Sequence, residues 1–421
     1  FRCSWRCGQR HYVFTSVGRR SDVQGASRNR KLGNGHRRFS LPPRHSTSVS
    51  VEIEGLVKVK NSKLVVVLGM HRSGTSAITR GLEVLGVNLG DNLYPAAIDN
   101  PKGFWEDNDF LGINEELLAH LDYSVDRLGL IDWQMPSTAI VESLELKAEK
   151  LVSERCKKNA LWGFKDPRTA RLLPFWQAVF ERVGCDVRYV IATRNPISIV
   201  ESLYKRSGFE GGTTFYLWLE HLIPAISGTM NAKRVVVDYD QLLENPKLQL
   251  LRVAKALGVT APEPLALFAF ESEFLDVGLR HTYFTMQDLE RYPSVPLQVV
   301  TAYDWLVKLA NDSVLLDSAE TKSVFEALSQ ELIFLSPTLN FIGYQEQKIV
   351  TFTQTIAERE QLIAALQAQT QDLQAQAQDQ LKGAAWMTSQ RDAWEQSAVQ
   401  SHQAIAALDA KLYKIRSHWG M

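Results

Sequence analysis

A glycine-containing loop that directly follows a buried apolar run constrains this chain most strongly. The run is Lys63–Leu68 (KLVVVL), and the residues from Gly69 to Ser76 read GMHRSGTS. A run this short and this rich in valine predicts a buried parallel strand, and Ser76–Leu85 has the apolar spacing of a helix. A strand, a glycine loop and a helix in this order are typical of a phosphate-binding loop.

The loop departs from the usual nucleotide-triphosphatase pattern, which has lysine after its second glycine. Here Thr75 follows Gly74, and the basic residue, Arg72, comes earlier in the loop. Backbone N–H groups from Ser73 to Ser76 are expected to cradle an oxyanion at the helix start. Arg72 would add bidentate contacts, and the hydroxyls of Ser73, Thr75 and Ser76 would add donors.

Further strands alternate with helices along the chain. Short apolar runs predict these strands, and apolar spacing of three and four residues predicts the helices between them. We therefore expect an α/β fold of the P-loop nucleotide-binding type, in which a three-layer arrangement places helices on both faces of a parallel sheet. Residues 259–300 hold many prolines and aromatics and are predicted to be irregular. The strands are predicted at Leu161–Phe164, Asp186–Thr193 and Arg234–Asp238.

Two more basic loops follow predicted strands, Lys165-Asp166-Pro167-Arg168 and Arg194-Asn195-Pro196. Ligands of open parallel sheets bind at the carboxyl ends of the strands, so three basic loops there would converge on one polyanionic ligand. Each loop taken alone also has a purely structural interpretation. Gly74 would then serve a tight turn, Ser76 a helix N-cap, and the arginines would pair with surface acids or cap a helix.

Taken together, these loops resemble the sulfotransferases that use 3'-phosphoadenosine 5'-phosphosulfate (PAPS), in particular the bacterial and Golgi-type branches. The likeness covers about residues 60–260. In that family a loop like Arg72–Ser76 holds the 5'-phosphosulfate, and a strand followed by arginine and a serine eight residues later, here Arg194 and Ser202, holds the 3'-phosphate. A Lys-Asp-Pro segment like that at Lys165 recurs there, and Tyr239–Leu243 resembles a late family segment.

The resemblance implies PAPS as co-substrate and no metal ion. Lys165 would neutralise the bridging oxygen as it leaves, together with Arg72. The acceptor must lose a proton, so a general base is expected within hydrogen-bond reach of it. Glu106 is the first candidate, since burial between aromatic residues and a helix start would raise its pKa. His71, inside the loop, is the second. The alternative for Glu106 is that it only favours a helix N-terminus, as do its acidic neighbours.

Aromatic residues near these motifs offer a surface for an acceptor, because aromatic faces suit sugar rings and phenols. Core packing is the alternative role for each of them. We expect the acceptor to be a carbohydrate or a glycoconjugate that presents a hydroxyl or an amine. The candidates are Phe104, Trp105, Trp133, Phe209, Tyr216 and Trp218.

Two other functions remain open. A nucleotide or small-molecule kinase would use Asp238, which follows an apolar strand, as a magnesium ligand. A non-catalytic nucleotide-binding scaffold would bind the nucleotide without turnover.

The zero net charge of the chain hides a basic tail. Residues 1–50 hold 11 Lys and Arg against one acid, Asp22, whereas the remainder holds 36 against 46. A nucleic-acid arm is one interpretation, but a composition dominated by Arg, Ser and Gly favours disorder over residues 1–57, and we expect no nucleic-acid partner. Because the chain begins with Phe1, a non-native origin of this tail is a further alternative.

A domain over residues 58–344 is expected to precede a helical, coiled-coil-like extension over 345–421, where glutamine and alanine dominate. Its apolar seam, through Ile356 and Ala377, is interrupted by Arg359, Thr370 and Gln380. The extension is an oligomerisation stalk through which copies self-associate, a linker to another module, or a solvated spacer. No run of about 18 apolar residues predicts a transmembrane segment, and four scattered cysteines favour a reducing, cytoplasmic setting.

Overall fold

The computed structural model describes residues 62–97, 100, 102–134, 137–208, 211–275 and 282–418. The predicted basic tail over 1–57, together with Pro101 and Phe209, lies outside the described residues.

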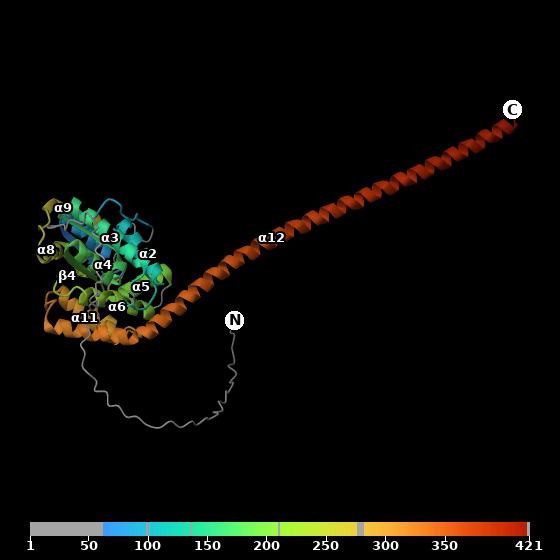
Figure 1. The fold of residues 1–421 in the computed structure, drawn as a ribbon. Helices are drawn as coiled ribbons and strands as arrows, with labels where there is room; N and C mark the ends of the chain where they lie inside the picture. The colour runs from blue at the N-terminus through green and yellow to red at the C-terminus, as the bar shows by residue number, and fades with distance from the viewer. Residues whose placement is uncertain are drawn as a thin grey trace, which may run out of the picture. The chain divides into compact units, whose positions relative to one another are not determined.

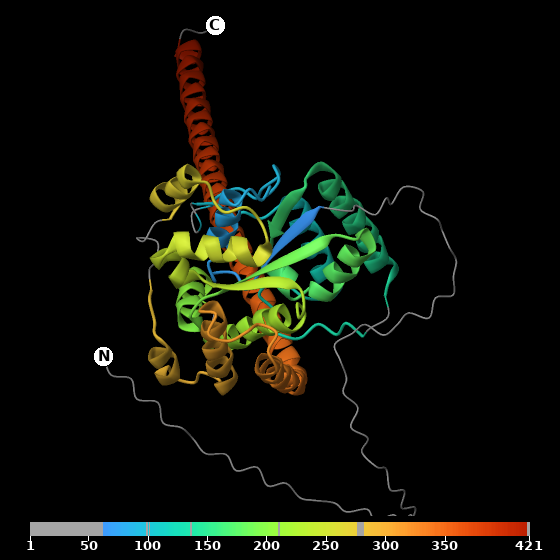
Figure 2. The same cartoon turned by 90° about the vertical axis from the view of Figure 1, so that its left-hand side faces the viewer.

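Four parallel strands form a single sheet with the order β2-β1-β3-β4. Strand β1, which leads into the glycine loop, is central in the sheet, because it pairs with β2 on one side and with β3 on the other. All four carboxyl ends therefore meet at one edge of the sheet. The predicted α/β class with a parallel sheet is confirmed (Figure 2). The strands are β1 (Lys63–Leu68), β2 (Leu161–Lys165), β3 (Asp186–Thr193) and β4 (Lys233–Asp238).

Helices pack against both faces of this sheet (Figure 2). Successive side chains of a strand point to opposite faces, so Val66 of β1 enters one hydrophobic cluster and Val67 enters the other. The cluster that contains Val67 is built with α1 (Thr75–Val84), α7 (Tyr239–Glu244), α8 (Pro246–Leu257) and α9 (Pro264–Ala269). The larger cluster takes α2 (Asn108–His120), α3 (Ala139–Lys158), α4 (Leu173–Val183), α5 (Pro196–Ser207), α6 (Gly211–Ser227), α10 (Met286–Arg291), α11 (Leu297–Ala310) and the start of α12 (Ala319–His418).

Polar residues at the strand ends start several of these helices. Asn195 caps α5 by accepting a hydrogen bond from the Ile197 N–H, and Asp166 caps the 3₁₀-helix η1 (Pro167–Ala170) in the same way. In both cases proline takes the first helical position, where its missing N–H costs nothing. The basic loops are therefore short and are anchored at both ends.

Residues 259–300 are more regular than the sequence predicts. They include α9, a π-helical turn η2 (Phe270–Phe274) and α10, which begins with a capping box between Thr285 and Asp288. Helices of six residues are too short to show an apolar repeat, and only their caps mark them. The prediction of an irregular segment was wrong here.

The last helix, α12, runs without a break from Ala319 to His418 (Figure 1), so the helix of the predicted extension over 345–421 begins well before Gln345. A proline inside a helix, here Pro337, removes one hydrogen bond, but residues on both sides of it, Leu332 and Leu339, are buried. Packing therefore holds the helix together across the proline. None of the described helices is both long enough and apolar enough to cross a bilayer.

Candidate active site

A cavity of about 500 Å³ opens at the carboxyl edge of the sheet. It is lined by residues that end or follow each of the four strands. Its other lining residues include Asn100, Lys102, Phe104, Glu106, Phe274, Leu275 and Thr282. Nine of the ten predicted site residues line it: His71, Arg72, Gly74, Thr75, Ser76, Glu106, Lys165, Arg194 and Ser202. Ser73 does not, and its side chain is fully buried.

The loop after β1 presents an uncapped helix N-terminus to this cavity. Gly74 occupies the N-cap position of α1 with φ 80°, and no side chain caps the helix. The N–H groups of the first helical turn have no acceptor within the helix and are a ready site for an anion. The predicted cradle begins at Gly74 rather than at Ser73, because the Ser73 N–H donates to the Met70 carbonyl at 3.2 Å.

Tyr239, the first residue of α7, closes one side of this loop. A Cβ added to Gly74 would lie 2.1 Å from Cδ2 of the Tyr239 ring. Glycine is therefore required here both by the left-handed backbone and by the close approach of the ring.

Arg72 and Ser202 meet directly. Arg72 has φ 69°, and its Nε donates to Oγ of Ser202 in α5 at 2.7 Å. The sequence predicts that Ser202 acts together with Arg194, but in the structure its hydroxyl contacts the β1 loop. A residue held in the left-handed region costs backbone energy, and such residues cluster at functional sites.

Lys165, at the end of β2, is a buried ammonium group. Its Nζ lies 2.7 Å from Oε1 of Glu106, 2.8 Å from the Phe104 carbonyl and 3.5 Å from Oγ of Ser76. It therefore joins the predicted base to the start of α1. The residue before Glu106, Trp105, has φ 60°, a second left-handed residue beside the cavity.

Burial raises the pKa of Glu106 above its ordinary value, and the neighbouring Lys165 opposes this shift. A carboxylate with a raised pKa beside a cavity is what a general base requires. The helix-capping interpretation applies to its neighbour instead, because Asp107 is the N-cap of α2 and accepts from the Asp109 N–H.

His71, the second predicted base, is less suited to the role. Burial, with help from the nearby His221 and Arg206, holds its pKa well below the ordinary value. The ring is therefore neutral but weakly basic. Its Nε2 lies 3.3 Å from an oxygen of Asp126.

Arg194, which follows β3, faces Tyr239 across the cavity. Its guanidinium carbon lies 4.8 Å from the centre of the Tyr239 ring, and Nη2 donates to the Thr282 carbonyl at 3.2 Å. Its buried Nε has no hydrogen-bond partner among the described residues. Buried donors are rarely left without a partner, and a ligand acceptor is one way to satisfy this group.

Basic side chains dominate the lining. Six basic residues and one acid, Glu106, line the described part of the cavity wall. Three of the basic residues were missed from the sequence: Lys102, Lys205 and Arg206. The last two lie in the final turn of α5, two to three turns beyond the basic loop, where lysine and arginine are also common because they favour the helix C-terminus. Only the placement of α5 brings them to the site.

The aromatic candidates divide between cavity and core. Phe104 lines the cavity, whereas Trp218 is fully buried in the core. Trp105 packs against Phe274, and Trp133 and Tyr216 pack partly buried against the larger cluster.

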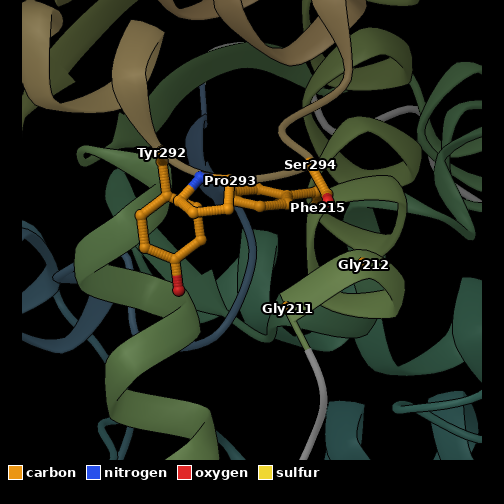
Figure 3. Close-up of a pocket in the computed structure, with 6 residues that line it drawn as sticks. All are labelled: Gly211, Gly212, Phe215, Tyr292, Pro293 and Ser294. Atoms are coloured by element: carbon orange, nitrogen blue, oxygen red, sulfur yellow. The ribbon is translucent and has the colours of Figure 1, made fainter.

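A second cavity, of about 420 Å³, shares no lining residue with the first (Figure 3). Phe215 of α6 and Tyr292 form one part of it, with ring centres 5.7 Å apart and the rings nearly perpendicular. Among its described lining residues the Tyr292 phenol is the only ionisable group.

Asp238, the predicted ligand of the kinase alternative, caps a helix. Its Oδ1 accepts from the N–H groups of Asp240 and Gln241 at 3.0 Å, and burial raises its pKa to about 6. In the part of the chain that the structure describes, no group of three or more His, Cys, Asp or Glu side chains is arranged to hold a metal ion.

Comparison with known proteins gives matches among solved structures only. The sulfotransferase domain from the Synechococcus PCC 7002 olefin synthase matches with 16% identity and a TM-score of 0.36, over 58% of this chain and 94% of that domain. Sulfotransferase STF1 from Mycobacterium tuberculosis H37Rv matches with 16% identity and a TM-score of 0.29, over 53% of this chain and 74% of that one. No family model and no curated protein match the chain.

Proposed function

We propose that this protein is a sulfotransferase, which moves a sulfuryl group from PAPS to a hydroxyl or amine of an acceptor. The observation that carries the proposal is the Lys165–Glu106 pair, 2.7 Å apart, beside the uncapped start of α1. It offers a cation for a leaving oxygen and a carboxylate for a proton within one cavity.

The positions of the cations favour a ligand with two separated anionic groups. Lys165 ends β2 and Arg194 follows β3, and β1 lies between these strands. Neighbouring strands are about 4.8 Å apart, so the two loops start roughly 10 Å from each other. A nucleotide with a phosphosulfate on one side of its ribose and a phosphate on the other suits this spacing. We propose the β1 loop, as a phosphate-binding loop, for the first group and Arg194 for the second.

Transfer of the sulfuryl group requires little from the protein besides fixed charges and a base. The acceptor oxygen or nitrogen bonds to sulfur, the bond from sulfur to the 5'-phosphate oxygen breaks, and the electron pair stays on that oxygen. Lys165, Arg72 and the N–H groups of α1 stabilise the charge on the departing 3',5'-adenosine bisphosphate. Glu106 takes the proton of the acceptor.

Glu106 must exchange its present contact with Lys165 for one with the acceptor. The ammonium then turns to the leaving oxygen, which replaces the carboxylate as its charged partner. A ligand that offers this exchange avoids leaving a buried ammonium unpaired.

The acceptor that we propose is a carbohydrate or a glycoconjugate. The exposed surface of Phe104 beside Glu106 offers an aromatic wall for a sugar ring. The oxygen that accepts the sulfuryl group would lie within hydrogen-bond reach of Glu106.

Calorimetry tests the donor site. We expect 3',5'-adenosine bisphosphate to bind in the micromolar range without magnesium, about −8 kcal/mol. Preference for ATP with magnesium would contradict the proposal and favour a kinase. Incubation with sulfur-labelled PAPS and a panel of glycans then tests turnover, and bound bisphosphate without any labelled product would favour the scaffold alternative.

A further inference from the structure

The second half of α12 carries an unbroken heptad repeat that extends on both sides of the seam predicted between Ile356 and Ala377. From Ile349 to Ile415 a seam of 20 positions alternates steps of three and four residues. Fifteen of the seam residues are apolar. The large ones are Ile349, Phe352, Ile356, Ile363, Leu366, Leu373, Met387, Trp394, Ile405, Leu408, Leu412 and Ile415, and Ala377, Ala384 and Ala398 complete the set.

This seam is exposed although it lies on a regular helix. Each of its twelve large apolar side chains is at least 52% exposed, the lowest value being that of Leu366. Residues 347–418 include no buried position. The same span holds 18 large apolar residues, and 12 of them occupy the two seam positions of the seven-residue repeat. A solvated spacer requires no such concentration on one stripe, whereas a coiled coil requires it.

We propose that α12 pairs with α12 of a second copy of this chain as an antiparallel coiled coil. The polar residues of the seam give the direction. In a parallel, in-register pair, Arg359 would face Arg359 of the other copy and Arg391 would face Arg391, with like charges in one layer. Lys411 and Arg416, at flanking positions of successive heptads, would also face each other across the helices.

The antiparallel pair with full overlap removes these conflicts. In it Ile349 faces Ile415 of the other copy. Each later seam position of one copy then faces the correspondingly earlier seam position of the other. Arg359 then packs against Ile405, and Arg391 packs against Leu373. An arginine can lay its apolar stem along such a neighbour and keep its charge in water.

Side-chain sizes complement each other in the same register. Trp394 faces Thr370, Met387 faces Ala377, and Leu366 faces Ala398, so large residues meet small ones near the middle of the seam. Leu381, which is 71% exposed and lies just beside the seam, faces Leu381 of the other copy near the two-fold axis. Alternation of large and small residues is what interdigitated packing requires.

The flanking charges agree with this direction. Glu360 faces His402 of the other copy, and Lys411 faces Thr355 instead of a second cation. The seam spans about 100 Å at 1.5 Å per residue, long enough for a specific interface that does not depend on the globular part.

The first experiment measures the molar mass of the full chain in solution by light scattering coupled to size exclusion, over a hundredfold dilution that starts at about 100 μM. We expect about twice the 47.5 kDa of one chain. A mass of one chain at every concentration, or a mass above two, would overturn the proposal.

A matched pair of variants locates the interface. Ile363→Glu with Leu366→Glu places two charges on the seam opposite Ser401 and Ala398, whereas Ala368→Glu with Ala375→Glu places the same charges on the opposite face of the helix. We expect the seam variant to weaken association at least about 100-fold and the control to change it less than about threefold. Helix content from circular dichroism shows whether α12 is retained. A dimeric seam variant would place the interface elsewhere and overturn the proposal.

Cysteine cross-linking decides the direction. In the antiparallel pair Phe352 faces Leu412 of the other copy. Phe352→Cys and Leu412→Cys chains should cross-link on mild oxidation only when the two are mixed and re-annealed. Cross-links within either variant alone, beyond those of the unsubstituted chain, would show a parallel pair and contradict the inferred direction.

Discussion

The carboxyl edge of the sheet and the second half of α12 assemble their functional side chains in opposite ways. At the edge, Arg72, Lys165 and Arg194 come from segments separated by up to 122 residues, and they line one cavity. On α12 the seam residues follow one another every three or four positions and lie on the surface. A cavity of converged charges needs the whole fold, whereas a helical stripe needs only the helix. Changes at one region should therefore leave the other unaffected, and each prediction below tests this separation.

The largest effect is expected at Glu106. Glu106→Gln removes the proton acceptor and keeps the size of the side chain, so turnover should fall about 10²–10⁴-fold, while affinity for adenosine bisphosphate stays within a few-fold. Because burial raises the pKa of Glu106, the activity of the unsubstituted enzyme should be present above that pKa and lost as pH falls through it. Single-turnover rates measured across a range of pH test both the loss of turnover in the variant and the pH dependence of the unsubstituted enzyme. An unchanged rate in Glu106→Gln would place the base elsewhere, with His71 as the next candidate.

Arg194→Ala should weaken binding of the bisphosphate by about 2–5 kcal/mol, because a ligand phosphate would lose a buried charged partner. Arg252→Ala is the control, since Arg252 pairs with Asp312 and does not line the cavity. Calorimetry measures both affinities. Equal affinities in the two variants would remove Arg194 from the site.

Substitution of one glycine in each region allows a direct comparison of the two. Gly74→Ala should lower the free energy of unfolding of the domain by about 1–3 kcal/mol, because the left-handed backbone and the Tyr239 ring both oppose a side chain. A Cβ on Gly383, within α12, would meet nothing within 4 Å. Gly383→Ala should therefore favour the helix by roughly 0.5–1 kcal/mol. Chemical denaturation, followed by tryptophan fluorescence and circular dichroism, measures both. If both substitutions changed the free energy of unfolding in the same direction, tight packing around the β1 loop would not explain why residue 74 is glycine.

Buried electrostatics should make the domain, but not α12, sensitive to pH. Burial raises the pKa of Glu220 in α6 from 4.5 to about 7, against the neighbouring Arg171. The folded state then holds the proton more tightly than the unfolded state, so this stabilisation is complete below about pH 4.5 and is lost as pH rises to about 7. The loss should be roughly 1–3 kcal/mol. Glu220→Gln should flatten the dependence of domain stability on pH over that range. An unchanged dependence would indicate that the nearby arginine keeps Glu220 ionised.

Substitutions on the α12 seam are expected to have no effect on nucleotide affinity. Ile363→Glu with Leu366→Glu, on the α12 seam, should leave the affinity for adenosine bisphosphate unchanged within about twofold, because none of the described lining residues of the cavity comes after Thr282. The same calorimetric titration measures it. A larger loss of affinity would mean that assembly and the cavity are coupled.

Much of the fold could be predicted from local pattern. The strand before the glycine loop, and those ending at Thr193 and Asp238, were predicted to within one residue because buried parallel strands are continuous apolar runs. The short helices between 264 and 291 were not, since six residues hold too little periodicity. Nine of the ten predicted site residues line one cavity, but their proposed roles stay predictions.

Some residue pairs that are in contact in the structure could not be predicted from the sequence. Cys156 and Cys185 are 29 residues apart, yet their sulfur atoms lie 3.1 Å from each other where the end of α3 meets the start of β3. Both are free thiols. The contact between Arg72 and Ser202 is of the same kind, because it depends on where α5 packs against the loop.

Local sequence pattern accounts for the strand–loop–helix unit at Lys63–Val84, the other basic loops at the ends of β2 and β3, and the helical stripe of α12. These features follow from backbone propensity and apolar spacing over a few neighbouring residues. Tertiary packing is needed to bring Lys165 to Glu106, to bury Ser73 away from the cavity, and to bring Lys205 and Arg206 to it. Such contacts join residues that are distant in the chain, and they depend on how sheet and helices pack, which no local pattern encodes.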